Sequence, residues 1–178
     1  TDGPVPATHA VRGLHSITIP EVADRGTAGV LTELLGLDPS DAGGGRHRLS
    51  ARGATIGAHA DLRRVAGSPR GLGGTGIVHH VAFRVPDDAA ELALRATIVD
   101  AGLDITPPID RRYFHSLYFR EPGGVLFEIA TDPPGFTVDE PADRLGDRLS
   151  LPPWLEAGRD TIERSLPPIV TRYSGAGA

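Results

Sequence analysis

Apolar and polar residues alternate in two short stretches, residues 80–85 and 125–130. Successive side chains of a β-strand point to opposite faces, so both stretches are predicted strands with one apolar and one mixed face. His80 and Glu128 lie on the mixed faces, where an unpaired polar group would be costly if it were buried. The apolar positions are Val81, Phe83 and Val85 in the first stretch, and Val125, Phe127 and Ile129 in the second.

A helix is predicted after the first of these strands. Asp88 and Glu91 have the spacing of a capping box, apolar residues follow at helical intervals, and Gly102 marks the end. A second helix is predicted over residues 24–35, with Gly36 as its stop.

The chain contains an internal repeat. The stretch VRGLHSITI (11–19) resembles GIVHHVAFR (76–84), and RGATIGAHAD (52–61) resembles PGGVLFEIATD (122–132). Each copy predicts a strand, a helix and then further strands. We therefore expect an α+β fold of two βαβββ modules that form a curved, half-open, barrel-like mixed sheet.

The repeat predicts the following domain organisation. Residues 9–67 form the first module, 68–75 a glycine-rich linker, 76–132 the second module and 133–178 a proline-punctuated tail that wraps the second module. One short helix is predicted in this tail near residues 155–165.

Composition removes several kinds of chemistry. The 178 residues contain no cysteine, which excludes disulfides and thiolate sites, and all 18 basic residues are arginine, which excludes a lysine Schiff base. The net charge of −5 without a basic stripe argues against a nucleic-acid partner. No apolar run is long enough for a membrane span and no secretory segment is evident, so we expect a cytoplasmic protein.

The two modules offer four equivalent ligand positions on their first and last strands. Aligning the copies places His15 with His80 and Gly57 with Glu128. Two histidines and one carboxylate are the ligand set of non-heme Fe(II) oxygenases, and Mn or Zn would also suit these donors.

These residues resemble the vicinal oxygen chelate superfamily, which includes glyoxalases, bleomycin-resistance proteins and extradiol dioxygenases. The motifs VHHVAFRVPDD, DRRYFHSLYFREPGGVLFEIATDPPGFTVDEP and LPPWLE are most similar to ring-cleaving dioxygenases that act on hydroquinones. The resemblance implies that His80 and Glu128 are Fe(II) ligands. It also implies that Tyr118, Arg111 and His79 lie around them as catalytic residues, although strand alternation would point His79 away from His80.

The chain departs from that family in length. Those enzymes have four modules, and this chain resembles their last two, so the family's N-terminal iron-binding histidine has no match here. In other extradiol dioxygenases the equivalent ligand comes from the third module, which makes His15 the candidate third ligand. Otherwise the third ligand would come from another chain or from a missing N-terminal half.

The expected function is therefore ring cleavage of a dihydroxylated aromatic such as a hydroquinone, with Fe(II) and O2. A glyoxalase-type isomerase or lyase would use the same fold but fill the fourth ligand position, where Gly57 carries no donor. A non-catalytic half-protein that binds a small ligand is the other alternative. Modules of this fold often pair between chains, so a homodimer is expected.

Overall fold

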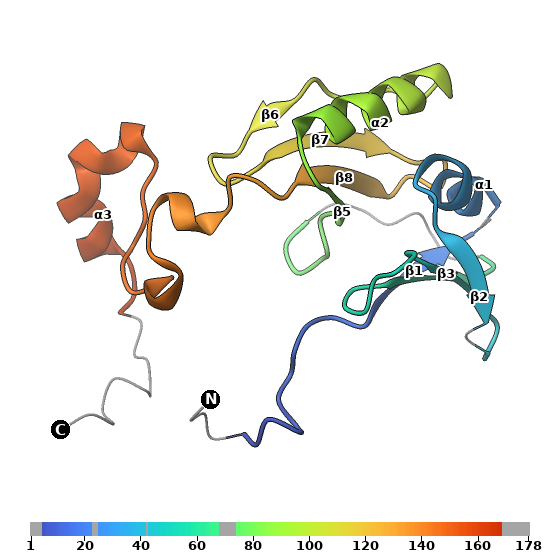
Figure 1. The fold of residues 1–178 in the computed structure, drawn as a ribbon, viewed down its shortest axis with the longest axis horizontal. Coiled ribbons are helices and arrows are strands. Elements are labelled where there is room, and N and C mark those ends of the chain that lie inside the picture. Colours follow the sequence, from blue (N-terminus) through green and yellow to red (C-terminus); the bar gives the residue numbers. More distant parts are fainter. Residues whose placement is uncertain (1–4, 23–24, 42, 68–73, 169–178) are drawn as a thin grey trace. The chain divides into compact units, whose positions relative to one another are not determined.

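The structure is a computed structural model that describes residues 5–22, 25–41, 43–67 and 74–168. Residues 1–135 form one unit and residues 136–178 a second. The first unit contains two four-stranded mixed sheets, each built from a strand, a helical segment and three further strands (Figure 1). The predicted α+β fold of two βαβββ modules is confirmed, with two curved sheets rather than a closed barrel. The predicted linker, residues 68–75, lies mostly outside the described residues.

In the first module, β1 pairs in parallel with β4, and the sheet order is β1-β4-β3-β2. The helical segment between β1 and β2 begins as α1 and continues as the π-helical turn η1. It ends before Gly36, whose φ of 70° only glycine adopts readily, which confirms the predicted stop. The bounds are β1 (Ser16–Glu21), α1 (Arg25–Gly29), η1 (Val30–Leu34), β2 (Asp38–Asp41), β3 (Arg46–Ser50) and β4 (His59–Arg64).

The second module repeats this order, with β5 parallel to β8 and the sheet order β5-β8-β7-β6. The helix α2 is capped by Asp87, whose Oδ1 accepts a hydrogen bond from the Ala90 N–H at 2.8 Å. The predicted capping box of Asp88 and Glu91 is therefore wrong by one residue, because Asp87 is the extended residue that precedes the helix. The bounds are β5 (Val81–Val85), α2 (Asp88–Asp100), β6 (Ile109–Asp110), β7 (His115–Arg120) and β8 (Leu126–Thr131).

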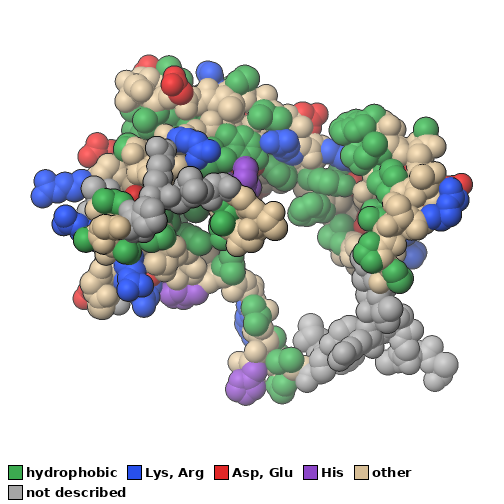
Figure 2. Space-filling model, turned by 180° about the vertical axis from the view of Figure 1, so that it is seen from behind, with side chains coloured by type: hydrophobic (Ala, Val, Ile, Leu, Met, Phe, Trp, Pro, Cys, Tyr) green, Lys and Arg blue, Asp and Glu red, His purple; other side chains and the backbone are tan. Residues whose placement is uncertain are grey.

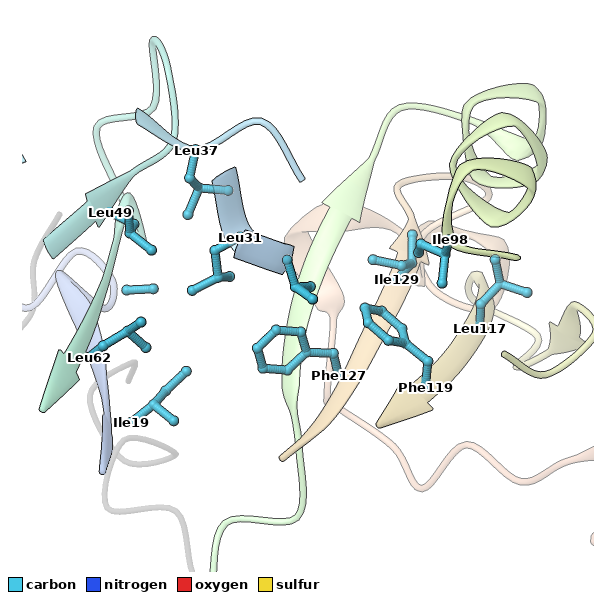
Figure 3. Close-up of a cluster of buried hydrophobic side chains, with 12 residues drawn as sticks. Ile19, Leu31, Leu37, Leu49, Leu62, Ile98, Leu117, Phe119, Phe127 and Ile129 are labelled. Atoms are coloured by element: carbon cyan, nitrogen blue, oxygen red, sulfur yellow. The ribbon is translucent and has the colours of Figure 1, made fainter. Parts of the chain in front are cut away.

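One apolar cluster joins the two modules, and both sheets and both helical segments contribute to it (Figure 3). The predicted apolar faces of β5 and β8 point into this cluster, which leaves the mixed faces on the opposite side of the sheet. The cluster contains Ile19, Leu31, Leu49 and Leu62 from the first module and Ile98, Leu117, Phe119, Phe127 and Ile129 from the second.

Glu121 ties the turn between β7 and β8 to the first module. Its carboxylate is buried, and Oε2 accepts hydrogen bonds from the Thr27 hydroxyl at 2.6 Å and from the Gly123 N–H at 2.7 Å. Oε1 accepts from the Val125 N–H at 2.6 Å. A buried carboxylate with three donors is well satisfied, so this turn holds β8 in a defined place beside α1.

The second unit has short helical segments and no fully buried apolar side chain among its described residues, 136–168. Trp154, for example, is 79% exposed, and apolar side chains are common on the face shown in Figure 2. The short helix predicted near residues 155–165 is confirmed by η4 and α3, whereas wrapping of the tail around the second module stays a prediction. The bounds are η2 (Phe136–Val138), η3 (Ala142–Arg144), η4 (Pro153–Gly158) and α3 (Arg159–Ser165).

Membrane crossing would need about 20 consecutive apolar helical residues. Within the described ranges, none of the helices combines the necessary length with the necessary apolar character.

Buried Glu91 predicts a pH-dependent stability. It is 1% exposed, and its Oε1 has no hydrogen-bond partner in the described part of the chain. Burial raises the pKa of its carboxyl, which His115 lowers in part and Asp88 raises further. Because the folded-state pKa is raised, folding favours the protonated carboxyl of Glu91. The resulting contribution to stability is complete below the unfolded-state pKa and is lost as the pH rises through the folded-state value. Glu91→Gln is therefore expected to raise the free energy of unfolding at pH 8 by about 1 kcal/mol.

Urea denaturation between pH 4 and pH 8 measures this effect, and the gain should shrink toward the acid end. Glu33→Gln, at an exposed position of η1, is the matched control and should show no such trend. A gain from Glu91→Gln that is constant across this range would contradict the assignment.

Candidate active site

The candidate site lies on the face of the second sheet opposite the apolar cluster, which we call the site face. Glu128 is in the middle of β8, and its direct cross-strand neighbours are Ala82 on β5 and Tyr118 on β7. His80 precedes β5 by one residue. Strand alternation therefore accounts for the placement of Glu128 and Tyr118 on one face.

Glu128 uses both carboxylate oxygens within this site. Its Oε2 lies 2.7 Å from Nε2 of His80, and its Oε1 accepts a hydrogen bond of 2.5 Å from the Tyr118 hydroxyl. Glu128 is only 4% exposed, although this face lies away from the core, because its neighbours cover it. A buried carboxylate with two partners is rigid and oriented, which a ligand or an acid–base group requires.

His79 joins the same network. Its Nδ1 lies 2.9 Å from Nδ1 of His80, and the two rings are nearly perpendicular. Both residues precede β5, which begins at Val81, so strand alternation does not separate their side chains. This explains how His79 lies beside His80, which the alternating pattern alone did not predict.

The bond between the two imidazoles requires one proton on one of the two Nδ1 atoms. If His80 Nε2 offers its lone pair to a metal, the His80 proton resides on Nδ1 and is donated to Nδ1 of His79. A histidine that binds metal ordinarily has its other ring nitrogen fixed by such a partner. His79 is thus placed to orient His80.

Arg111 completes the site on the side of Tyr118. Its guanidinium carbon lies 5.4 Å from the centroid of the Tyr118 ring, within the range of a cation–π contact, and its Nε donates to Ser116 Oγ at 3.4 Å. The turn that carries Arg111 has a φ of 69° at Arg112, and the Arg112 N–H donates to Asp110 Oδ1 at 2.6 Å. This local bond supports the unfavourable backbone conformation beside the site.

His15 does not join His80 and Glu128. It is exposed, and its ring lies 4.8 Å from the ring of His59, whose Nδ1 is 2.8 Å from Ser50 Oγ. Within the described ranges, no three His, Asp or Glu side chains are grouped so that they could hold a metal ion.

The strand register explains the separation. β4 and β8 are both six-residue strands that pair in parallel with the first strand of their module, with Ile17 opposite Ala60 and Val81 opposite Phe127. Matching these core-facing pairs puts Asp61, not Gly57, at the position of Glu128. The same match makes Ser16 the counterpart of His80.

The expected alignment of Gly57 with Glu128 was therefore wrong. Gly57 lies in the turn before β4, with a φ of 59°. By the same register, the counterpart of Tyr118 is Arg48, which pairs directly with Asp61 across β3 and β4.

In the first module, Arg48 occupies both oxygens of the carboxylate that corresponds to Glu128. Its Nε and Nη2 donate to the two oxygens of Asp61 at 2.6 and 2.7 Å, and the Asp61 side chain has no exposed surface. This bond lowers the pKa of the Asp61 carboxyl. Sequence reasoning missed the pair, although the alternation in RHRLS (46–50) and HADLRR (59–64) places both residues away from the core.

The donors of the second module fit a divalent metal in kind but not in number. Imidazole nitrogen and carboxylate oxygen suit Fe(II), Mn(II) or Zn(II), and His80 and Glu128 approach each other on one face. A two-histidine, one-carboxylate set needs one more nitrogen, which the described residues do not bring to this point. The chain thus brings together one imidazole and one carboxylate, which are donor types that such a set uses.

The family model described as "Glyoxalase/Bleomycin resistance protein/Dioxygenase superfamily" matches residues 26–129. "Putative ring-cleaving dioxygenase MhqO" of Bacillus subtilis (strain 168) is 39% identical over 172 residues, which cover 97% of this chain and 54% of that protein. "Chlorohydroquinone/hydroquinone 1,2-dioxygenase" of Sphingobium indicum is 42% identical over 94 residues, which cover 52% of this chain and 29% of that protein.

A solved structure, described as a putative dioxygenase from Bacillus subtilis, superimposes with a TM-score of 0.88 at 39% identity. The match covers 97% of this chain and 55% of that one. The chain thus spans about half the length of the relatives that it matches over nearly its whole sequence.

Proposed function

This chain belongs to the Glyoxalase/Bleomycin resistance protein/Dioxygenase superfamily, and we propose that it serves the ring cleavage of a dihydroxylated aromatic, such as a hydroquinone, by a non-heme Fe(II) and O2. The names of its relatives support this reaction class. The observation that carries the proposal is the network of His79, His80, Glu128 and Tyr118 on one sheet face.

His80 and Glu128 would hold the metal. When bound, Fe(II) supplies a Lewis acid with open positions for a phenolate and for O2. The third ligand is His15 if the chain rearranges, or a histidine of another chain or of a segment outside this sequence, because all seven histidines of the sequence lie among the described residues. The register argues for the second source, because Ser16 rather than His15 is the counterpart of His80.

The remaining residues act on protons and charge. The Tyr118 hydroxyl holds a proton 2.5 Å from Glu128 Oε1 and can exchange it with a phenolic oxygen beside that carboxylate. His79 orients His80 and offers its second ring nitrogen, Nε2, for proton transfer. The Arg111 guanidinium, stacked near Tyr118, supplies positive charge where a substrate oxygen becomes negative.

One observation supports a second candidate function. The described residues supply two metal ligands rather than three, which suits a half-protein that needs a partner chain or that binds a small ligand without catalysis. A glyoxalase-type reaction has less support, because the first module's carboxylate at the equivalent position, Asp61, is already bound by Arg48. A homodimer remains a prediction of the same proposal.

Anaerobic measurement of Fe(II) bound per chain, followed by O2 uptake with hydroquinone, tests the proposal. We expect the wild type to bind Fe(II) at this site, and His15→Ala to bind it as well as the matched control His47→Ala, at an exposed position of β3. Loss of iron in His15→Ala alone would instead make His15 the third ligand. An iron-loaded wild type that consumes no O2 with any hydroquinone would overturn the catalytic proposal in favour of the binding protein.

A further inference from the structure

Thr106 binds both polar main-chain groups of Tyr118. It lies in the segment between α2 and β6, and its hydroxyl accepts a hydrogen bond of 3.0 Å from the Tyr118 N–H. Its own N–H donates to the Tyr118 carbonyl oxygen, also at 3.0 Å. A single residue thus fixes the backbone of β7 at the point where it carries the phenol of the candidate site.

These two bonds determine how Tyr118 faces Glu128. The N–H and C=O groups of one strand residue point to the same neighbouring strand, so those of Tyr118 point to Thr106 and away from β8. Tyr118 and Glu128 are direct cross-strand neighbours and therefore form a pair without main-chain hydrogen bonds between them. In such pairs the Cα atoms are roughly 4.5 Å apart and the side chains lie close together. The bond of 2.5 Å between phenol and carboxylate is accordingly what joins the two residues.

The residues that follow Thr106 cannot replace it. Pro107 and Pro108 have no backbone N–H, so neither can donate a hydrogen bond to β7. The ladder resumes at Ile109, which pairs with Ser116 rather than with Tyr118. On the side of β7 away from β8, the position of Tyr118 therefore depends on Thr106.

Thr106 is itself fixed to the helix and to the core. Arg95 of α2 donates through Nε to the Thr106 carbonyl oxygen at 3.0 Å, and both residues are half-buried. The preceding residue, Ile105, forms a β-bridge with Phe119, which belongs to the apolar cluster. A residue held in this way has few alternative positions, as is required of a group that orients another.

We propose that Thr106 is a positioning residue that sets the distance between the Tyr118 hydroxyl and the Glu128 carboxylate. The inference rests on the proposed function, in which this hydroxyl exchanges a proton with the substrate. Without the Thr106 hydroxyl, the Tyr118 N–H lacks its acceptor and turns toward water, so β7 shifts and the phenol moves away from Glu128. Proton transfer needs hydrogen-bond reach, and a displacement of about 1 Å can lower a rate by roughly 100-fold.

The 13C signal of the Tyr118 Cζ atom, identified by its loss in Tyr118→Phe, tests the proposal without metal or substrate. It reports the hydrogen bond of the attached hydroxyl. In Thr106→Val, which keeps the branched side chain, the signal should move toward its position in Glu128→Ala, where the carboxylate is gone. Thr106→Ser, which keeps the hydroxyl, should retain the wild-type signal. Thr97→Val is the matched control, because it removes a hydroxyl that donates to the Ala93 carbonyl on the exposed side of α2.

O2 uptake by the Fe(II)-loaded protein with hydroquinone is the second readout. We expect Thr106→Val to lower kcat by about tenfold at unchanged iron content and KM, and Thr106→Ser to retain the rate. A Tyr118 signal in Thr106→Val that coincides with the wild-type signal would overturn the inference. A displaced signal with an unchanged kcat would overturn the role of Thr106 in the reaction. A displaced signal in a protein whose iron-loaded wild type consumes no O2 would support the positioning of Tyr118 by Thr106 and overturn the proposed function instead.

Discussion

Glu128→Gln is expected to weaken binding of Mn(II) or Fe(II) by more than the roughly 10- to 100-fold that loss of an outer hydrogen-bond partner costs. The amide has the shape of the carboxylate but lacks its charge, and a neutral oxygen is a poor ligand for a hard cation. The amide oxygen can still accept from the Tyr118 hydroxyl, and its NH2 group can donate to His80 Nε2. The free energy of unfolding should therefore change little.

Mn(II) is the suitable probe, because it broadens nearby NMR signals even when the affinity is weak. Signals of the Tyr118 and His80 rings should broaden in wild type at Mn(II) concentrations that leave those of Glu128→Gln sharp. Tyr118→Phe is the matched control, since it removes the hydroxyl bonded to Oε1 and keeps the carboxylate. Equal broadening in Glu128→Gln and wild type would contradict Glu128 as a ligand.

The second module could be predicted from the sequence because each local signal agreed with the others. Alternation in β5 and β8 identified the core face, and Gly102, with a φ of 79°, ended α2 as expected. Once the face is known, strand pairing leaves few possible positions for the side chains of neighbouring strands. Glu128 and Tyr118 consequently lie directly opposite each other on β8 and β7.

The first module was harder to predict, because similarity between two stretches of sequence does not determine the strand register. Gly53 of RGATIGAHAD aligns with Gly124 of PGGVLFEIATD, but the turns that contain these glycines differ in length. Only the hydrogen-bonded ladder, which sets Ile17 opposite Ala60, puts Asp61 in the place of Glu128. This four-residue difference places Gly57 before β4 rather than on it, and the one-residue difference in β1 puts Ser16 rather than His15 in the place of His80, so the predicted role of Gly57 failed.

The sequence pattern also did not predict contacts made outside helices and strands. His79 precedes β5, where the backbone has no fixed alternation, and its hydrogen bond with His80 depends on the course of the incoming chain. Whether His15 could reach His80 was likewise a question of how two modules pack. Such distances follow from turns and from the shared core rather than from local propensity.

Arg48→Met is expected to lower the free energy of unfolding by about 3–5 kcal/mol, because it strands a buried carboxylate without its partner. Asp61 has no exposed side-chain surface, and Arg48 binds both of its oxygens. Arg46, at 3.6 Å and half exposed, can replace only part of that interaction. Urea denaturation at pH 7 measures the loss.

The pH dependence and a double variant identify the cause. Arg48 lowers the pKa of Asp61, so the pair's contribution is present above the unfolded-state pKa and is lost as the pH falls through the folded-state value. The deficit of Arg48→Met should therefore narrow in acid. Arg48→Met combined with Asp61→Leu should recover most of the stability at pH 7, because no charge remains buried. A double variant as unstable as the single one would mean that Arg48 stabilises the sheet by packing, and that the first module is not a site closed by an ion pair.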